Sequence, residues 1–230
     1  MEIIDKQYLK TPFYGSRRMT IVLKNMGNDV NKKRVQRLMK AMGIEAIYPG
    51  PNLSKRRLDH TIYPYLLKDL EIKRPNFVWS SDITFIKLKN GFLYLVAIID
   101  WFSRYVLSWN LSNTLTSDFC IEAVSDALKK ATKTAEIFNT DQGSQFTSNG
   151  FIQVINGTGM KISMDGRGRF LDNIFIERLW RSLKYEEVYI KEYNTVNEAR
   201  DGISNYFNFY NNERPHQSLD YKVPKDVYYQ

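Results

Sequence analysis

Apolar positions in the first part of the chain follow the period of amphipathic α-helices. Between Met19 and Met26 they recur at i, i+3, i+4 and i+7, which predicts a helix over residues 16–26. A second segment with the same period starts after Asn31, a favourable N-cap, and ends before Gly43. The pattern therefore predicts two short helices joined by a tight turn.

After residue 75 the apolar pattern changes to the period of β-strands. Residues 77–86 alternate between two faces, and the following Lys89-Asn90-Gly91 favours a hairpin turn. Residues 92–100 form a long apolar run, and residues 104–111 repeat the strand pattern. These features predict three consecutive strands.

The rest of the chain alternates between the two periods. Helices are predicted at residues 116–131, 148–157, 172–189 and 196–210, and strands at residues 136–141 and 160–164. Three consecutive strands followed by alternating helices and strands predict a mixed α/β sheet covered by helices.

Charge is distributed unevenly along the 230 residues. Residues 1–75 hold 16 lysines and arginines against 7 acidic residues, a net of +9, whereas residues 76–230 hold 17 against 18, a net of −1. A basic segment favours contact with a polyanion such as DNA, with a solvated lysine-rich surface as the alternative. In the second predicted helix the basic positions are Lys33, Arg34, Arg37 and Lys40. We interpret the two helices as a helix-turn-helix that contacts DNA, with an ordinary helical hairpin as the alternative.

Cysteine content and hydropathy narrow the class of protein. Cys120 is the single cysteine, which excludes an internal disulfide framework and disfavours a zinc site. The sequence shows neither a signal peptide nor an apolar run of about 18 residues. We therefore expect a soluble, cytoplasmic protein with no membrane partner.

Three acidic residues are candidates for chemistry. Asp82 lies in the middle of a predicted strand, where aspartate is uncommon, and Asp141 ends another strand at a turn. Each is either a structural acid or a functional one. Glu177 shares a helical row with Arg181 and Lys184. That row either forms surface ion pairs or places Glu177 at a metal while the two cations hold a phosphate backbone.

Three carboxylates from two strands and one helix would suit Mg²⁺, which prefers a few carboxylates together with water and substrate phosphate. Two such ions about 3.5–4 Å apart activate an attacking oxygen and stabilise the leaving oxygen during phosphodiester displacement. The hypothesis requires that Asp82, Asp141 and Glu177 meet within a few ångströms in the folded chain.

The sequence motifs around these acids carry a family resemblance. In chain order they are Trp79-Ser-Ser-Asp82-Ile-Thr84, Asn139-Thr-Asp141-Gln-Gly-Ser-Gln-Phe-Thr147, Ser163-Met164 with Gly168, Asp172-Asn173, Glu177-Arg-Leu-Trp-Arg-Ser-Leu-Lys184 and Arg214-Pro-His216-Gln-Ser-Leu219. This set resembles the insertion-sequence-three family of transposases, DDE enzymes with a retroviral-integrase-like core. The resemblance runs from about Tyr14 to the C-terminus and includes the 35-residue gap between Asp141 and Glu177.

The resemblance implies a fold and an activity. The implied fold is a ribonuclease-H-like mixed five-stranded sheet flanked by helices and preceded by a small helix-turn-helix-like domain. The implied site consists of the catalytic and metal-binding acids Asp82, Asp141 and Glu177, with two Mg²⁺ or Mn²⁺ ions, and of Lys184 at the position that holds the transposon end. Arg181, from the row beside Glu177, and Arg178 are further candidate DNA-binding residues. The implied reaction is hydrolytic cleavage at the ends of the element, after which the freed 3′-hydroxyl attacks DNA. A homo-oligomer would act on paired ends.

Some positions depart from the family pattern or have no assigned role. Arg214 and His216 belong to a family signature of unknown role, and pattern alone favours a packed or capping role for His216. Many members have His-Ser before the second Asp, where this chain has Asn139-Thr140. Many also have Trp before the Asp-Asn pair, where this chain has Leu171. The chain also starts inside the family pattern, so we interpret it as a truncated or separately translated product that could act with an upstream-frame product of the same element.

The sequence therefore predicts three parts: a helix-turn-helix-like DNA-binding region at residues 1–48, a basic linker at residues 49–75, and an integrase-like catalytic core with C-terminal helices at residues 76–230. Our leading hypothesis is a bacterial DNA transposase acting in the cytoplasm at the nucleoid. A ribonuclease-H-like nuclease without strand transfer and a non-catalytic DNA-binding regulator of transposition are the alternatives.

Overall fold

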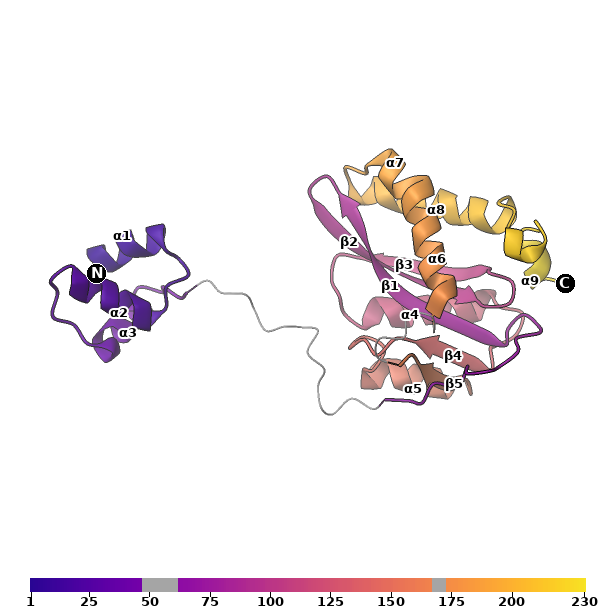
Figure 1. The fold of residues 1–230 in the computed structure, drawn as a ribbon, viewed down its shortest axis with the longest axis horizontal. Helices are drawn as coiled ribbons and strands as arrows, with labels where there is room; N and C mark the ends of the chain where they lie inside the picture. Colours follow the sequence, from indigo (N-terminus) through magenta and orange to yellow (C-terminus); the bar gives the residue numbers. More distant parts are fainter. Residues whose placement is uncertain (47–61, 167–172) are drawn as a thin grey trace. The chain divides into compact units, whose positions relative to one another are not determined.

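The computed structural model describes residues 1–46, 62–166 and 173–230. The chain divides into two compact units, Met1–Lys55 and Arg56–Gln230, and each is described by itself (Figure 1). Within the predicted linker, residues 49–61 lie outside the described residues. Residues 62–75 are described and pack against the larger unit: Leu67 is buried, and the backbone N–H of Leu66 donates to Ser163 Oγ at 3.0 Å. This part of the linker therefore belongs structurally to the larger unit.

The N-terminal unit contains three helices: α1 (Glu2–Lys10), α2 (Ser16–Asn25) and α3 (Lys32–Ala41). The second and third were predicted, whereas α1 was missed. Its apolar side chains are too few to show a period, and Ile4 alone is buried among them. The three helices share a small core of Ile4, Met19, Leu23, Val35 and Met39.

The predicted boundaries of α2 and α3 have a clear chemical basis. Asn31 is the N-cap of α3, and its side chain accepts a hydrogen bond from the backbone N–H of Arg34 at 2.8 Å. Gly27 and Gly43 follow the two helices with positive φ, a conformation that glycine adopts at little cost. Met26 is an exception to the predicted apolar stripe, because it lies beyond the end of α2 and is 55% exposed.

The larger unit is built on a five-stranded mixed sheet, which confirms the predicted fold class. Its strands are β1 (Val78–Leu88), β2 (Gly91–Asp100), β3 (Val106–Ser112), β4 (Ile137–Thr140) and β5 (Lys161–Met164). They lie in the order β3-β2-β1-β4-β5. The first three strands form an antiparallel meander, and β4 and β5 add to the other edge of β1 in parallel.

Helices follow the strands along the chain. They are α4 (Asp118–Lys130), α5 (Asn149–Gly157), α6 (Ile174–Leu183), the π-helical segment η2 (Lys184–Val188), α7 (Tyr189–Lys191), α8 (Val196–Asn212), the 3₁₀ segment η3 (Gln217–Leu219) and α9 (Pro224–Tyr228). The segment predicted as one helix over residues 172–189 is thus interrupted by a π-turn from Lys184. Periodicity does not reveal this interruption, since π-turns occur as single-turn bulges within otherwise helical segments.

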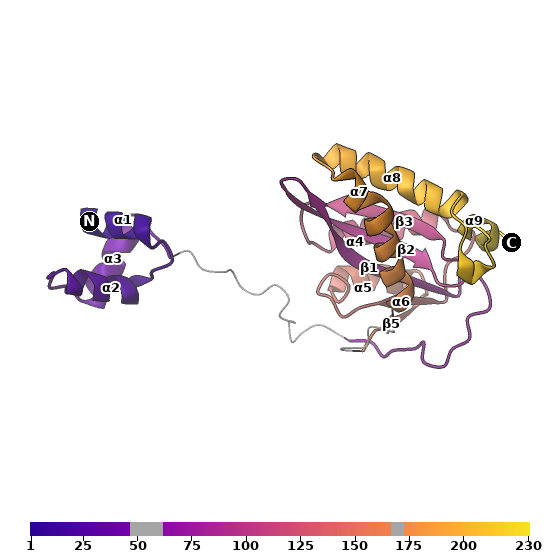
Figure 2. The ribbon, with the colours of Figure 1, turned by 45° about the horizontal axis from the view of Figure 1, so that its top comes forward.

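The two faces of the sheet are covered by different helices (Figures 1 and 2). On β2, Leu95, Ala97 and Ile99 join the core beneath α6 and α8, whereas the alternate Val96 and Ile98 join the core over α4 and α5. Both faces are therefore buried, which explains why β2 reads as a continuous apolar run rather than an alternating one.

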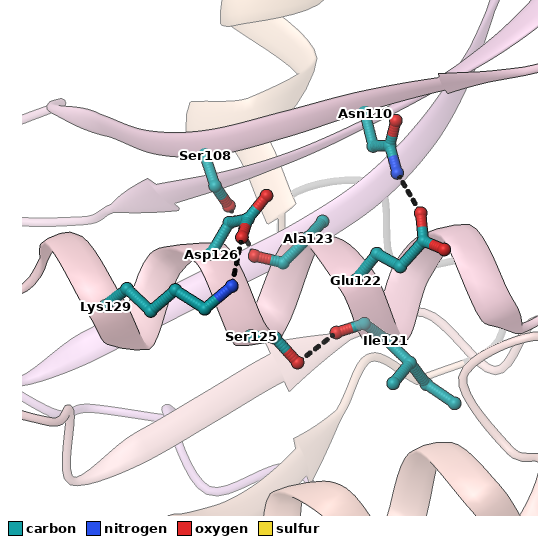
Figure 3. A network of polar contacts seen from close by, with 8 residues as sticks. All are labelled: Ser108, Asn110, Ile121, Glu122, Ala123, Ser125, Asp126 and Lys129. Atoms are coloured by element: carbon teal, nitrogen blue, oxygen red, sulfur yellow. Dashed lines mark hydrogen bonds and ion pairs between the residues drawn. The ribbon is translucent and has the colours of Figure 1, made fainter.

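Polar contacts fix α4 on its face of the sheet (Figure 3). Ser108 Oγ on β3 donates to the backbone oxygen of Ala123 at 2.7 Å, and Asn110 Nδ2 donates to Glu122 at 2.7 Å. On α4 itself, Lys129 pairs with Asp126 at 3.0 Å. The buried Ser108 contact anchors α4 to β3, while the exposed pair contributes little.

None of the helices in residues 1–46, 62–166 and 173–230 combines the length and apolar character needed to cross a lipid bilayer.

Candidate active site

The pairing of β1 with β4 brings together the segments that carry Asp82 and Asp141. In the parallel pair, Ser80 of β1 lies opposite Asn139 of β4. Asp82 follows Ser80 by two residues on β1, and Asp141 follows Asn139 by two residues, just beyond the end of β4. Side chains two residues apart point to the same face of a strand, so Asp82 shares the face of Ser80.

Asp82 is held from the other side by helix α6. The indole Nε1–H of Trp180 donates to Asp82 Oδ2 at 2.9 Å. The pKa of Asp82 is raised from 3.8 to about 6, chiefly by burial and also by the negative charges of Asp141 and Glu177, while the hydrogen bonds from Trp180 and from the backbone of Ile83 act to lower it. Asp141 and Glu177 therefore both lie within electrostatic reach of Asp82.

Asp141 lies in the turn that follows β4. Its Oδ1 accepts a hydrogen bond from the backbone N–H of Gly143 at 2.9 Å. Asp141 has exposed surface, yet the protein atoms around its carboxylate remove enough water to raise its pKa, while the Gly143 contact lowers it. A Cβ at residue 143 would lie 2.9 Å from Asp141 Oδ1, so any other residue at this position would require the Asp141 carboxylate to shift.

Glu177 and Lys184 occupy one row of α6 and its extension. Glu177 is exposed in the first turn of α6, and Lys184 is half-buried at the start of η2. Burial lowers the pKa of Lys184, whereas the negative charge of Asp82 raises it. Lys184 thus lies within electrostatic reach of Asp82.

The three carboxylates do not form a closed metal cage. In the part of the chain that the structure describes, no group of three or more His, Cys, Asp or Glu side chains is close enough together to hold a metal ion. The expectation that the acids meet within a few ångströms is therefore not met. The carboxylate of Asp82 accepts a hydrogen bond from Trp180, and that of Asp141 accepts one from Gly143. Repulsion between the negative carboxylates opposes their closer approach. The all-carboxylate donor set nevertheless fits a hard divalent cation.

Several residues that support the acids were missed by sequence reasoning. Trp180 was predicted only as part of a buried stripe, although it lies three residues after Glu177 and hence on a neighbouring part of the helix surface. Asn139 Nδ2 donates to Asp165 Oδ1 at 2.8 Å, and Gln142 Nε2 donates to the backbone oxygen of Asp165 at 2.9 Å. These contacts tie the Asp141 turn to the chain after β5. The motif residues Gly168, Leu171 and Asp172 lie outside the described residues.

Cys120 is buried in α4 near Asp141. Burial raises the pKa of its thiol, and the negative charge of Asp141 adds to this effect. The thiol therefore stays protonated and is a poor nucleophile.

The remaining predicted residues lie in two other places. On α3 of the N-terminal unit, the exposed residues are Lys33, Arg34, Arg37 and Lys40. In the larger unit, Arg178 and Arg181 are exposed on α6, and Arg214 pairs with Glu186 at 2.6 Å. His216 packs edge-on against Tyr210 with ring centroids 4.6 Å apart, which agrees with the packed histidine favoured by the pattern.

The fold and the acids define a class of protein: a ribonuclease-H-like core with one carboxylate on its central strand β1, one in the turn after β4 and one on the covering helix α6. Two family models described as "Integrase core domain" match residues 72–169 and 158–224, and one described as "HTH-like domain" matches residues 1–52.

Relatives and solved structures agree with this class. The IS904 transposase of Lactococcus lactis subsp. lactis (strain IL1403) is 35% identical over 93% of this chain and 86% of its own length. The IS3A transposase InsF of Escherichia coli (strain K12) is 28% identical over 88% of this chain and 72% of its own length. The chain belongs to the insertion-sequence transposases, which are DDE-type polynucleotidyl transferases with an integrase core domain.

Two solved structures show the same fold. A simian T-cell lymphotropic virus intasome structure matches with a TM-score of 0.60 at 17% identity, over 99% of this chain and 74% of that chain. The HTLV-2 integrase catalytic core domain in complex with magnesium matches with a TM-score of 0.55 at 20% identity, over 69% of this chain and 99% of that chain. An integrase-type core of this family implies the use of a divalent metal ion.

Proposed function

We propose that this chain cleaves DNA at the ends of an insertion sequence and joins the freed ends to target DNA, with Asp82, Asp141 and Glu177 as its catalytic carboxylates. The proposal is supported by the parallel pairing of β1 with β4, which runs up to Ser80 and Asn139, two residues before Asp82 and Asp141, and by the contribution of the Asp141 charge to the raised pKa of Asp82. The charge of Glu177, which contributes to the raised pKa of Asp82, supports the third position.

The same acids would hold two Mg²⁺ or Mn²⁺ ions. When bound, such ions lower the pKa of an attacking hydroxyl and neutralise charge on the leaving oxygen. The chain's own residues have separate tasks: Trp180 orients Asp82 through its 2.9 Å hydrogen bond, and Gly143 fixes the Asp141 carboxylate. Lys184 is placed to bind a phosphate of the transposon end next to the acids.

The reaction has two displacements at phosphorus. Water attacks the phosphodiester at the end of the element, the P–O bond to the 3′-oxygen breaks, and that oxygen leaves as a 3′-hydroxyl after taking up a proton. The freed 3′-hydroxyl then attacks a target phosphodiester, loses its proton and releases a target 3′-hydroxyl. The number of phosphodiester bonds is conserved in the second displacement, so no external energy source is required.

DNA binding involves further parts of the chain. The N-terminal region, residues 1–48, is proposed as a helix-turn-helix-like DNA-binding domain, in which α3 supplies the exposed cations Lys33, Arg34, Arg37 and Lys40. Residues 76–230 are proposed as the catalytic core; of the predicted linker, residues 49–75, the part from residue 62 packs on this core. We place the protein in the bacterial cytoplasm at the nucleoid, acting as a homo-oligomer on paired ends, with an upstream-frame product of the element as a further partner.

A strand-transfer assay tests this proposal. The full chain is incubated with Mg²⁺, a target plasmid and duplexes of the element's terminal sequence, either intact or already cleaved at the 3′ end. We expect cleavage of intact ends and joining of precleaved ends, and loss of both products in Asp141→Asn. Asp126→Asn, an exposed acid on α4, is the matched control and should keep both activities.

Each other outcome has a definite meaning. Unchanged products from Asp141→Asn would overturn the catalytic assignment. Cleavage without joining would favour a ribonuclease-H-like nuclease. Salt-sensitive DNA binding that survives loss of all three carboxylates, with no metal-dependent product from the wild type, would favour a non-catalytic regulator.

A further inference from the structure

A basic pocket lies beside α6, away from the paired strand acids. It has a volume of about 760 Å³ and is lined by residues of α6, by Arg104 before β3 and by the segment that follows α8. Arg104, Arg178, Arg181 and Arg214 line it, and Glu186 is the single acidic residue among its described lining residues. Four arginines and one glutamate give the lining a formal charge of +3. We call this site the arginine pocket.

Arg104 is the most strongly positioned cation of the arginine pocket. Its backbone has φ of 64°, an uncommon conformation for a residue with a side chain. Its guanidinium carbon lies 3.5 Å from the centre of the Phe175 ring, a close cation–π contact. Among the described residues it forms no ion pair, although it is half-buried. A desolvated, fixed and unpaired guanidinium is well suited to bind an anion.

Burial affects the charge of Arg104 without removing it. Its pKa is lowered to about 10, chiefly by burial and also by the nearby positive Arg178, while Tyr210 and Asp100 act in the opposite direction. Arg104 therefore remains protonated at neutral pH. Its interaction with an anion would relieve the repulsion from Arg178.

The single acid of the arginine pocket is already neutralised. Both carboxylate oxygens of Glu186 accept hydrogen bonds from Arg214, at 2.9 Å from Nε and 2.6 Å from Nη2. The hydroxyl of Tyr206 also donates to Glu186 at 2.9 Å. This network fixes the segment of the family signature against η2 and α8. Arg214 is thus a positioning residue, and the charges left for a ligand are those of Arg104, Arg178 and Arg181.

Helix geometry connects the arginine pocket to the acids. Successive residues of an α-helix are separated by about 100° around its axis. Arg178 therefore lies about 100° from Glu177, and Arg181 lies about 40° from it on the same side, because four residues exceed one turn by that angle. The exposed Arg181 bridges the row of Glu177 and the lining of the pocket.

We propose that the arginine pocket binds a backbone phosphate of the DNA substrate, a few nucleotides away from the phosphate that reacts, with Arg104 as its central ligand. This proposal rests on the proposed function, since it assumes that DNA lies over Glu177. Polymeric DNA fits better than a free nucleotide because Arg178 and Arg181 continue the positive charge out of the pocket onto the exposed surface of α6.

DNA-binding measurements test the proposal. Fluorescence anisotropy with labelled duplexes of about 30 base pairs, without added metal, gives Kd as a function of salt. In Arg104→Gln we expect Kd to rise about tenfold and the slope of log Kd against log salt to fall by about 0.9, the contribution of one phosphate contact. Arg178→Gln should show the same change with a smaller rise in Kd. Both changes should be similar for terminal and unrelated sequences, because phosphate contacts carry no base specificity.

Arg200→Gln is the matched control. Arg200 is an exposed arginine of α8 that does not line the arginine pocket. It lies ten residues before Tyr210, about 15 Å along the helix. This variant should keep the wild-type Kd and slope.

Wild-type Kd and slope in both Arg104→Gln and Arg178→Gln would overturn the proposal. If urea unfolding shows that Arg104→Gln does not fold, Arg178→Gln alone decides in the same way. Titration with a nucleoside diphosphate and with inorganic phosphate forms a second arm. Arg104-dependent binding of either, together with Arg104-independent binding of DNA, would also overturn it.

Failure of the proposed function gives a different result. If Asp141→Asn keeps its products while Arg104→Gln loses one unit of slope, the catalytic assignment fails and the arginine pocket stands. If Asp141→Asn loses its products while the slope is unchanged in both arginine variants, the reverse holds.

Discussion

Helix α6 presents opposite chemistry on two adjoining parts of its surface. Toward β1 it offers Trp180 and Glu177 to Asp82, an acid whose pKa is raised by burial and by other acids. Toward the C-terminal segment it lines the arginine pocket, where the pKa of Arg104 is lowered by burial and by Arg178. The region around Asp82 gathers negative charges and the arginine pocket gathers positive charges, and both regions are partly shielded from water. The acidic part is therefore suited to cations and the basic part to phosphates, and a metal-dependent DNA enzyme needs both.

Asp82→Asn should have the largest effect and should separate the two parts. We expect DNA cleavage and strand transfer to fall by about 10³-fold or more, as for loss of a residue that acts as part of a catalytic unit. DNA binding should be unchanged or tighter, because a negative charge is removed next to the phosphate path. Product gels and anisotropy measure the two properties. Equal loss of binding and activity would contradict a division of labour between the two parts of α6.

The same substitution should change how stability depends on pH. The pKa of Asp82 is raised from 3.8 to about 6, so the folded state retains this proton more tightly than the unfolded chain does. The resulting stabilisation is complete below about pH 4 and is lost as pH rises through about 6. At pH 7 without added metal, Asp82→Asn should therefore raise the free energy of unfolding, by at most about 3 kcal/mol for a shift of two units and by less for a partly exposed group. Urea unfolding at several pH values measures the change. Asp126→Asn should leave the pH dependence unaltered.

Lys184→Gln should have an intermediate effect, on DNA binding and on the pKa of Asp82. Kd for duplex DNA should rise up to about tenfold, and the salt slope should fall by about 0.9, since one phosphate contact is lost. The pKa of Asp82 should also rise, because Lys184 and Asp82 interact electrostatically. Anisotropy and carboxyl NMR titration measure the two effects. Lys129→Gln, on α4, is the control. A normal salt slope in Lys184→Gln would remove Lys184 from the DNA path.

Trp180→Phe should have a smaller effect that is confined to the acidic part. The substitution keeps most of the buried ring but removes the N–H that donates to Asp82. A hydrogen bond to a charged group contributes about 1.5–3 kcal/mol, so the pKa of Asp82 should rise above 6 by about one unit. Carboxyl NMR titration without metal measures this shift. Unchanged pKa of Asp82, or an altered DNA salt slope, would contradict the role assigned to the indole.

Glu186→Gln should have the smallest effect, confined to the basic part. Burial acts to raise the pKa of Glu186, but hydrogen bonds from Arg214 and Tyr206 outweigh it and lower the pKa. Because the pair is partly exposed, we expect a loss of less than about 1 kcal/mol in the free energy of unfolding at pH 7. Urea unfolding, with the exposed Glu192→Gln as control, measures it. Loss of several kcal/mol would show that this network supports the fold rather than the arginine pocket.

The acidic part of α6 was largely predictable from the sequence, and the basic part was not. Asp82 and Asp141 stand out because apolar strands surround them, and Glu177 stands out through its motif. The arginine pocket combines Arg104 with residues more than 70 positions later in the chain, a proximity that depends on how α6 and the end of α8 pack on the sheet. No local period carries that information.

Two smaller differences between the predicted and the observed structure also arise from features that local sequence patterns do not show. The π-turn at Lys184 changes helix phase without changing composition, and the packing of residues 62–75 depends on partners such as Ser163 that are distant in the sequence. Local sequence patterns thus predicted the helices and strands and singled out the individual acidic residues. The contacts that orient those acids, including the Trp180 indole and the Gly143 amide, arise only when the elements are assembled.

The most direct test of the central claim is a count of bound Mn²⁺ by electron paramagnetic resonance, with and without duplex DNA. The claim is that the carboxylates of Asp82 on β1, Asp141 after β4 and Glu177 on α6 together bind the metal ions. We expect the DNA complex of the wild type to bind Mn²⁺, Asp82→Asn to lose that binding, and Arg104→Gln to retain it at saturating DNA. Equal Mn²⁺ binding by the wild type and Asp82→Asn would contradict the account.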